Sequence, residues 1–251
     1  MSVTDVKLRA EYGAAVERMV GRALDALKGV EGTCGPAQPL SRAEPAALRV
    51  LGPDVFTPRL LASPASGHDA AREVAEAYRV FPPAVGGDAV ARWLDWATWT
   101  LASRNGSADP APAPAREPAP ARPAGPFFPV PDCLPAADGW RPWSLAMARL
   151  APLALPGLDS PLHDAARADP LALARGTVRA MLRRDHRTAA RLVRWLAWLA
   201  WLGRQARLTG PAGPSGPPGV RGPVVPEGVP VEIEPLITRL KQVGDGSART
   251  A

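Results

Sequence analysis

The chain has 251 residues, of which 46% are apolar, and its formal net charge is +6. This length allows one large domain or two domains of roughly 75 to 80 residues each. No stretch of about 18 consecutive apolar residues occurs, which argues against a membrane-spanning helix. The first 19 residues lack the apolar core of a secretory signal. With only two cysteines, we expect a reducing, cytoplasmic setting and no membrane span.

The chain begins with a predicted helix over residues 4–27. Apolar side chains such as Tyr12, Val16 and Met19 recur there at helical spacing, and Gly29 follows as a stop signal. This segment lies outside the repeat described below. Residues 1–29 are therefore expected to form a separate N-terminal helix.

Residues 30–106 are predicted to form a first helical unit. We expect one helix over residues 68–80, ended by two prolines, and a second helix that runs from an N-cap at Asp88 to about residue 106. Residues 107–126 are rich in Pro and Ala. Such a segment buries too little apolar surface to fold and is expected to act as an extended spacer.

Residues 127–209 are predicted to form a second helical unit. Ser160, Asp169 and Asp185 occupy N-cap positions, and a proline follows each of the first two. These signals predict a series of helices that ends with a long one near residue 209.

The C-terminal part of the chain is predicted to be a tethered tail. Residues 210–228 contain four collagen-like triplets, which are too few for a triple helix and indicate a Gly/Pro linker. Residues 229–251 are expected to hold a short strand at 231–234 and one or two helical turns from Pro235. This tail is interpreted either as a docking segment or as a cap that folds back.

Four landmarks recur in the same order in the two units. They are a Cys-x-Pro-Ala segment, a Ser-Pro pair, a His-Asp-Ala-Ala-Arg segment and an Arg-Trp-Leu-x-Trp-x-x-Trp segment. The landmarks predict an all-α fold made of an internally duplicated helical unit, with the two copies related by a pseudo-two-fold axis. The corresponding residues are Cys34 and Cys133, Ser63 and Ser160, His68 and His163, and Arg92 and Arg194.

The Trp segment is the most distinctive of the four. Three Trp spaced by three residues sweep an arc of about 120° on a helix. Trp buries a large area and needs a partner for its indole N–H. We therefore expect each Trp helix to be the central helix of its unit and the two helices to pack against each other. The residues are Trp93, Trp96, Trp99, Trp195, Trp198 and Trp201.

Positive charge is concentrated in residues 170–209, which hold nine arginines and one acid, a net charge of +8. Four of these arginines are predicted to form one stripe because spacings of three, four and three residues return to the same helix face. The counterpart could be phosphate, a lipid surface, an acidic protein partner, or the acids of the first unit, and we favour the last two. The stripe is Arg184, Arg187, Arg191 and Arg194, and the acids are Glu73, Glu76, Asp88 and Asp95.

Cysteine and histidine provide the only weak candidates for a metal or redox site, and these are Cys34, His68, Cys133 and His163. Zinc modules place two ligands within about five residues of each other, whereas here Cys and His lie 34 and 30 residues apart in the two units. No phosphate-binding loop, dinucleotide fingerprint or metalloprotease motif occurs. We therefore expect neither a cofactor nor a catalytic residue.

These patterns favour a non-catalytic adaptor, scaffold or assembly component that binds protein partners through exposed helices and tethered termini. The alternative is a nucleic-acid-binding protein that contacts phosphates through the Arg stripe. A Cys/His metal-binding or redox protein is the third hypothesis.

Overall fold

The computed structural model confirms the predicted all-α class. It describes residues 3–29, 43–62, 70–83, 87–106, 131, 134–135, 139–209 and 232–248. Within these ranges the chain is mostly helical and holds no strand, and none of the helices there has the length and apolarity needed to cross a bilayer. The chain divides into unit 1, Met1–Pro131 with Leu155–Leu158, and unit 2, Asp132–Ala154 with Asp159–Ala251. The predicted linkers, 107–126 and 210–228, lie outside the described residues.

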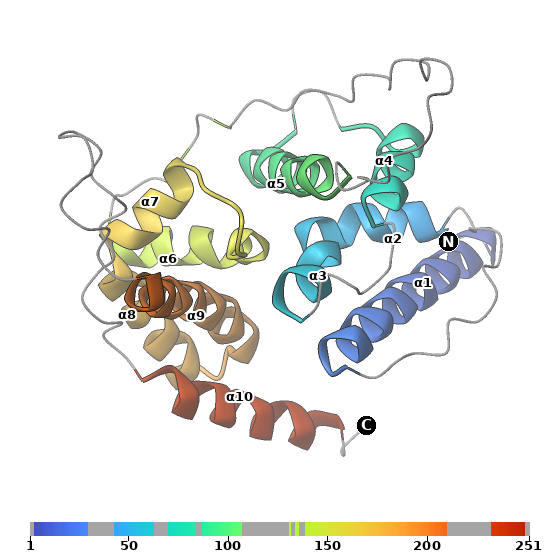
Figure 1. The fold of residues 1–251 in the computed structure, drawn as a ribbon. Helices are drawn as coiled ribbons and strands as arrows, with labels where there is room; N and C mark the ends of the chain where they lie inside the picture. The colour runs from blue at the N-terminus through green and yellow to red at the C-terminus, as the bar shows by residue number, and fades with distance from the viewer. Residues whose placement is uncertain are drawn as a thin grey trace, which may run out of the picture. The chain divides into compact units, whose positions relative to one another are not determined.

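Unit 1 is built around α2, which contacts α1, α4 and the short 3-10 helix η1. Its core contains Ala15 and Met19 of α1 together with Ala47 and Leu48 of α2. The small alanine side chains allow the helix backbones to approach closely. The elements are α1 (Val3–Leu27), α2 (Ala43–Leu51), η1 (Gly52–Phe56), α3 (Thr57–Leu61), α4 (Ala70–Val80) and α5 (Ala89–Gly106) (Figure 1).

Three polar side chains connect the helices of unit 1. Asp95 of α5 forms an ion pair with Arg49 of α2 and accepts a 2.8 Å hydrogen bond from the Tyr78 hydroxyl of α4. The Arg49 guanidinium also lies 3.9 Å from the centre of the Tyr78 ring. Burial and the Asp95 carboxylate both raise the pKa of Tyr78, so this phenol remains protonated and keeps donating.

Unit 2 is a cluster of helices around α8 and α9, which pack along each other. Helix α6 contacts both of them, and η2 contacts α9. The elements are α6 (Trp140–Arg149), η2 (Ala151–Leu153), α7 (Pro161–Ala168), α8 (Pro170–Leu182), α9 (His186–Thr209) and α10 (Ile233–Ala248) (Figure 1).

Gly176 allows α8 to lie close to its neighbours. A Cβ atom at this position would lie 2.6 Å from Ser144 Cβ of α6 and 3.0 Å from Leu192 Cδ1 of α9. Atoms at 2.6 Å overlap, and Ser144 Cβ is attached directly to the α6 backbone, so no rotamer change relieves the contact. Only glycine therefore fits this three-helix junction.

Several predicted boundaries are confirmed. Helix α1 ends at Leu27, and α4 ends before the two prolines. The Asp88 carboxylate accepts a 2.7 Å hydrogen bond from the Ala91 backbone N–H at the start of α5. Asp169 and Asp185 bond the N–H groups three residues later in the same way, at 2.9 and 3.1 Å.

The predicted strand in the tail is wrong. Residues 233–234 begin α10, which continues to Ala248 and packs against α9 within unit 2 (Figure 1). Pro235 is the third residue of α10, where its missing N–H leaves no helical hydrogen bond unmade. Of the two interpretations of the tail, this contact supports a cap that folds back onto unit 2.

Candidate functional site

The Trp segments belong to the cores of their units. Trp93 and Trp96 are buried and meet edge to face, with ring centroids 5.5 Å apart. Trp195 and Trp198 are buried in the same arrangement at 5.7 Å. The Trp195 indole N–H donates a 2.9 Å hydrogen bond to the Met147 carbonyl of α6, which is the kind of partner that the sequence predicts. Packing of the two Trp helices against each other stays a prediction.

His163 is the buried polar group beside the second Trp pair. Its side chain is 0% exposed, and its ring lies edge to face with Trp195 and Trp198 at 5.5 and 5.0 Å. Nε2 lies 3.0 Å from the Leu153 carbonyl, which can only accept, so Nε2 carries the proton. Nδ1 then accepts a 2.7 Å hydrogen bond from the Ser160 hydroxyl. Ser160 stands at the N-cap of α7 as predicted, but its hydroxyl binds the imidazole and caps no backbone N–H.

Burial keeps His163 neutral. It lowers the pKa of the imidazole to about 4, and the nearby Arg167 charge acts in the same direction. Arg167 lies over the Trp198 ring at 5.1 Å and forms ion pairs with Asp159 and Asp164 at 2.9 and 2.6 Å. Because both ring nitrogens are engaged by protein groups, His163 has no free lone pair for a metal or a substrate.

The other metal candidates, Cys34, His68 and Cys133, lie outside the described residues. In the ranges that the structure does describe, no cluster of three His, Cys, Asp or Glu could hold a metal ion. The geometry of unit 2 therefore offers no support for a site that includes His163.

The structure corrects the predicted Arg stripe. Arg184 lies in the turn between α8 and α9, with a left-handed backbone (φ 59°), and is not part of the helical face. Arg187 and Arg191 are exposed on α9. Arg194 is half-buried and donates a 3.4 Å hydrogen bond to the Pro152 carbonyl. The exposed part of the stripe on α9 is thus reduced to two arginines.

Three of the four acids proposed as counterparts of the stripe bind groups of their own unit. Asp95 binds Arg49 and Tyr78, and Asp88 caps α5. Glu76 accepts a 2.9 Å hydrogen bond from Arg79 Nε, and this bond lowers the pKa of the carboxyl. Glu73 also has a partner. The counterpart of the arginines in unit 2 stays a prediction.

A groove on the outer side of α8 is the strongest candidate site. It has a volume of about 640 Å³ and lies between α8 and the start of α6. Leu171 and Val178 on its floor are each 45% exposed, and Leu182 at its end is 80% exposed. Exposed aliphatic side chains that gather in one place are typical of interaction surfaces. The lining residues are Trp140, Leu171, Ala174, Arg175, Val178, Arg179, Leu182 and Arg183.

The charges around this α8 groove all have the same sign. Arg175, Arg179 and Arg183 follow one another at four-residue intervals, and no acidic residue lines the groove. Burial, with the neighbouring charges of Arg183 and Arg141, lowers the pKa of Arg179. Arg141 also lies 5.4 Å from the centre of the Trp140 ring. An anionic ligand would relieve this repulsion between guanidinium groups.

The α8 groove was not predicted from the sequence, although its residues carry a signal. Leu171, Arg175, Val178, Arg179, Leu182 and Arg183 recur at three- and four-residue spacing. The predicted stripe, however, comprises only Arg184 to Arg194, and helix α6, which contributes Trp140, was not predicted.

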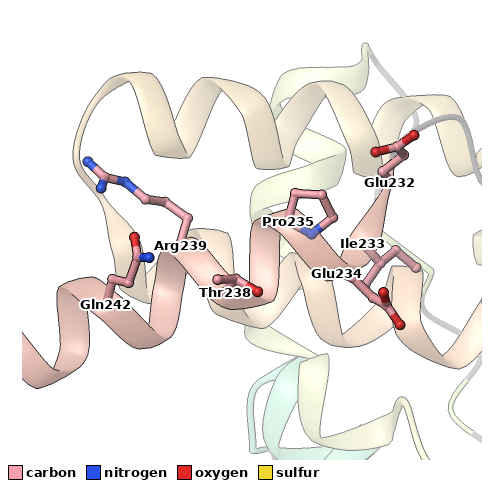
Figure 2. Close-up of a pocket in the computed structure, with 7 residues that line it drawn as sticks. All are labelled: Glu232, Ile233, Glu234, Pro235, Thr238, Arg239 and Gln242. Atoms are coloured by element: carbon pink, nitrogen blue, oxygen red, sulfur yellow. The ribbon is translucent and has the colours of Figure 1, made fainter.

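A second open groove, of about 590 Å³, lies on α10. All its lining residues come from α10 itself or directly precede it, as Figure 2 shows. Glu232, Glu234 and Arg239 are among them, so its charges are mixed. A hollow along one helix offers neither an enclosed pocket nor converging groups, and it supports no catalytic interpretation.

No protein family, no curated protein and no solved structure matches this chain.

Proposed function

We propose that this protein is an internally duplicated, non-catalytic adaptor or assembly component of the cytoplasm. In this proposal it binds a protein partner through the α8 groove. The observation that supports it is the combination of exposed Leu171, Val178 and Leu182 with a row of arginines beside Trp140. Removal of apolar surface from water drives association, and Trp and Arg are enriched among the residues that dominate binding energies at interfaces.

The test is affinity purification of the tagged full-length chain from its native host, with nuclease, followed by mass spectrometry. Leu182→Asp places a charge on the groove, and Leu208→Asp is the matched control. Both leucines are 80% exposed and lie near the C-terminal end of a unit 2 helix. We expect a partner that is recovered with the wild type and with Leu208→Asp but lost with Leu182→Asp. Recovery of every partner by all three proteins would show that the groove is not the binding site.

Nucleic-acid binding is the second candidate, and the exposed Arg187 and Arg191 on α9 favour it. Each phosphate contact makes the logarithm of the binding constant fall by about one unit per logarithmic unit of salt. Arg187→Gln with Arg191→Gln should therefore flatten the salt dependence of binding to duplex DNA. An unchanged slope would exclude these two residues as phosphate contacts.

A further inference from the structure

The outer face of α8 consists of two parallel rows of side chains. Leu171, Val178 and Leu182 form an apolar row, since intervals of seven and four residues return to nearly the same side of a helix. Arg175 and Arg179 of α8, with Arg183 at its C-cap, form a second row beside it, which turns by about 40° around the helix at each four-residue step. The apolar row runs from Leu171 to Leu182, a separation of 11 residues, or about 16 Å of helix axis.

This geometry matches the length of a short helix. A partner helix of three turns spans the same distance of about 16 Å and presents apolar side chains at intervals of three or four residues. Its apolar face would cover Leu171, Val178 and Leu182, while Trp140 of α6 also lines the groove. The buried Ala174 lies at the floor, where its small side chain leaves room for a protruding residue.

The charge of the second row determines the chemistry of the partner. In the part of the chain that the structure describes, Arg175, Arg179 and Arg183 have no carboxylate partner. Guanidinium groups bind carboxylates through two parallel hydrogen bonds. A helix with acidic residues along one edge would meet all three arginines while its apolar face meets the leucines.

Two other classes of anionic ligand fit the α8 groove less well. Nucleic acid needs a basic track with aromatic side chains for stacking, whereas this floor is aliphatic and Trp140 is its one aromatic group. A bilayer interface takes up helices with a large apolar face, whereas this apolar row is narrow and consists of three aliphatic side chains.

We infer that the α8 groove binds an acidic amphipathic helix of a protein partner, with its apolar residues on Leu171, Val178 and Leu182 and its carboxylates on Arg175, Arg179 and Arg183. This inference rests on the proposed adaptor function and specifies the chemistry of the partner.

The probe is a display library of helix-forming peptides with randomised surface positions, selected on the full-length chain and counter-selected on the Leu182→Asp variant. We expect the selected sequences to combine an apolar stripe with a clear excess of Asp and Glu. Neutral or basic sequences, or a selection that does not depend on Leu182, would overturn the inference.

The arginine row is tested separately with the best selected peptide, measured by fluorescence anisotropy. The variant Arg175→Gln, Arg179→Gln, Arg183→Gln should weaken binding at least tenfold and reduce its salt dependence. The control Arg187→Gln, Arg191→Gln, Arg204→Gln removes the same charge from α9 and should bind like the wild type. Equal loss in both variants would mean that only the net charge matters, and the inference would fail. Circular dichroism checks that both variants fold.

Vesicles with about 30% phosphatidylserine and a 20-base-pair duplex serve as the competing ligands. Tighter binding of either one that is lost in the Arg175, Arg179, Arg183 variant would replace the helix with a lipid or nucleic-acid ligand. The two proposals can fail separately. A native partner that requires Leu182 but does not compete with the acidic peptide leaves the adaptor function standing and removes this inference.

Discussion

Each unit has a buried Trp pair at the same position of the Trp motif, but the polar groups around the pair differ between the units. In unit 1 the variable residue that precedes the second Trp of the motif is Asp95, which binds Arg49 and Tyr78. The corresponding residue of unit 2 is Ala197. There the polar partner is His163, a neutral imidazole that belongs to α7 and lies against the rings.

The helices that carry the Ala-Ala-Arg end of the third landmark, α4 and α7, have different neighbours. In unit 1, α4 contacts α2 and the Trp helix α5. In unit 2, α7 contacts α8, and α8 packs along the Trp helix α9. The same Trp pattern is thus compatible with two kinds of polar partner, the ion-paired Asp95 in unit 1 and the neutral His163 in unit 2. Internal duplication of the units stays a prediction.

The largest expected effect comes from removal of the buried Trp in either unit. Trp93→Ala and Trp195→Ala should each lower the free energy of unfolding by about 3–5 kcal/mol, as large-to-small changes in cores do. Trp99→Ala and Trp201→Ala are the controls, because these side chains are half-buried and their loss should matter clearly less. Urea unfolding followed by circular dichroism measures the free energy of unfolding of each variant, and hydrogen exchange shows which helices lose protection. Equal effects of core and control variants would refute the assignment of the Trp pair to the cores.

The second prediction concerns pH, which distinguishes the neutral His163 of unit 2 from the ionic Asp95 of unit 1. The pKa of His163 is about 4 in the folded chain, against about 6.5 for an unperturbed imidazole. As pH falls, the unfolded chain therefore binds a proton before the folded chain does. The stabilisation that comes from the neutral imidazole is complete above pH 6.5 and is lost as pH falls toward 4. The loss amounts to about 3 kcal/mol.

Titration of the His163 ring resonance by NMR measures the pKa directly. The difference in unfolding free energy between the wild type and His163→Gln, followed from pH 7 to 4.5, isolates the contribution from that of the carboxyl groups. A titration midpoint near 6.5 would mean that the imidazole is not enclosed as the structure shows.

The sequence predicts some helices of both units well and others incompletely or not at all. Helices with an apolar stripe and an Asp cap, such as α5 and α9, have nearly the predicted bounds. Helix α10 was expected only as one or two turns from Pro235, although it runs from Ile233 to Ala248. Helices α2 and α6 were not predicted, and α6 begins after Gly139, which offers no side-chain cap to mark the start. All three helices have proline as their third residue, a position that tolerates it because the N–H groups of the first turn make no helical hydrogen bond.

The candidate site was only partly predictable for a different reason. The net charge of residues 170–209 predicts a basic surface there, but which arginines face solvent depends on tertiary packing. Arg184 leaves the helical face because the turn between α8 and α9 requires a left-handed residue, and Arg194 turns toward Pro152. Neither fact follows from residue spacing, which assumes an uninterrupted helix.

The third prediction contrasts two glycines. Gly176 lies at the three-helix junction of unit 2, whereas a Cβ at Gly13 of α1 would meet no atom within 4 Å. Gly176→Ala should destabilise the chain by about 1–3 kcal/mol through overpacking. Gly13→Ala should stabilise it by about 0.5–1 kcal/mol because alanine is the better helix former. Thermal unfolding shows whether each variant is more or less stable than the wild type. Ser144→Gly should restore part of the stability that Gly176→Ala loses.

The smallest expected effect concerns the caps of the two Trp helices. Asp88 and Asp185 begin α5 and α9, and each accepts a hydrogen bond from the N–H three residues later. Asp88→Ala and Asp185→Ala should each cost about 1 kcal/mol of unfolding free energy, and the Asn variants should retain most of it, since an amide oxygen also caps. The bonds to Thr188 lower the pKa of Asp185, so its contribution is present at neutral pH and is lost as pH falls below the ordinary range of Asp. Similar losses in the two variants would show that both Trp helices begin by the same capping mechanism although their polar surroundings differ, and a negligible loss in one would confine that mechanism to the other unit.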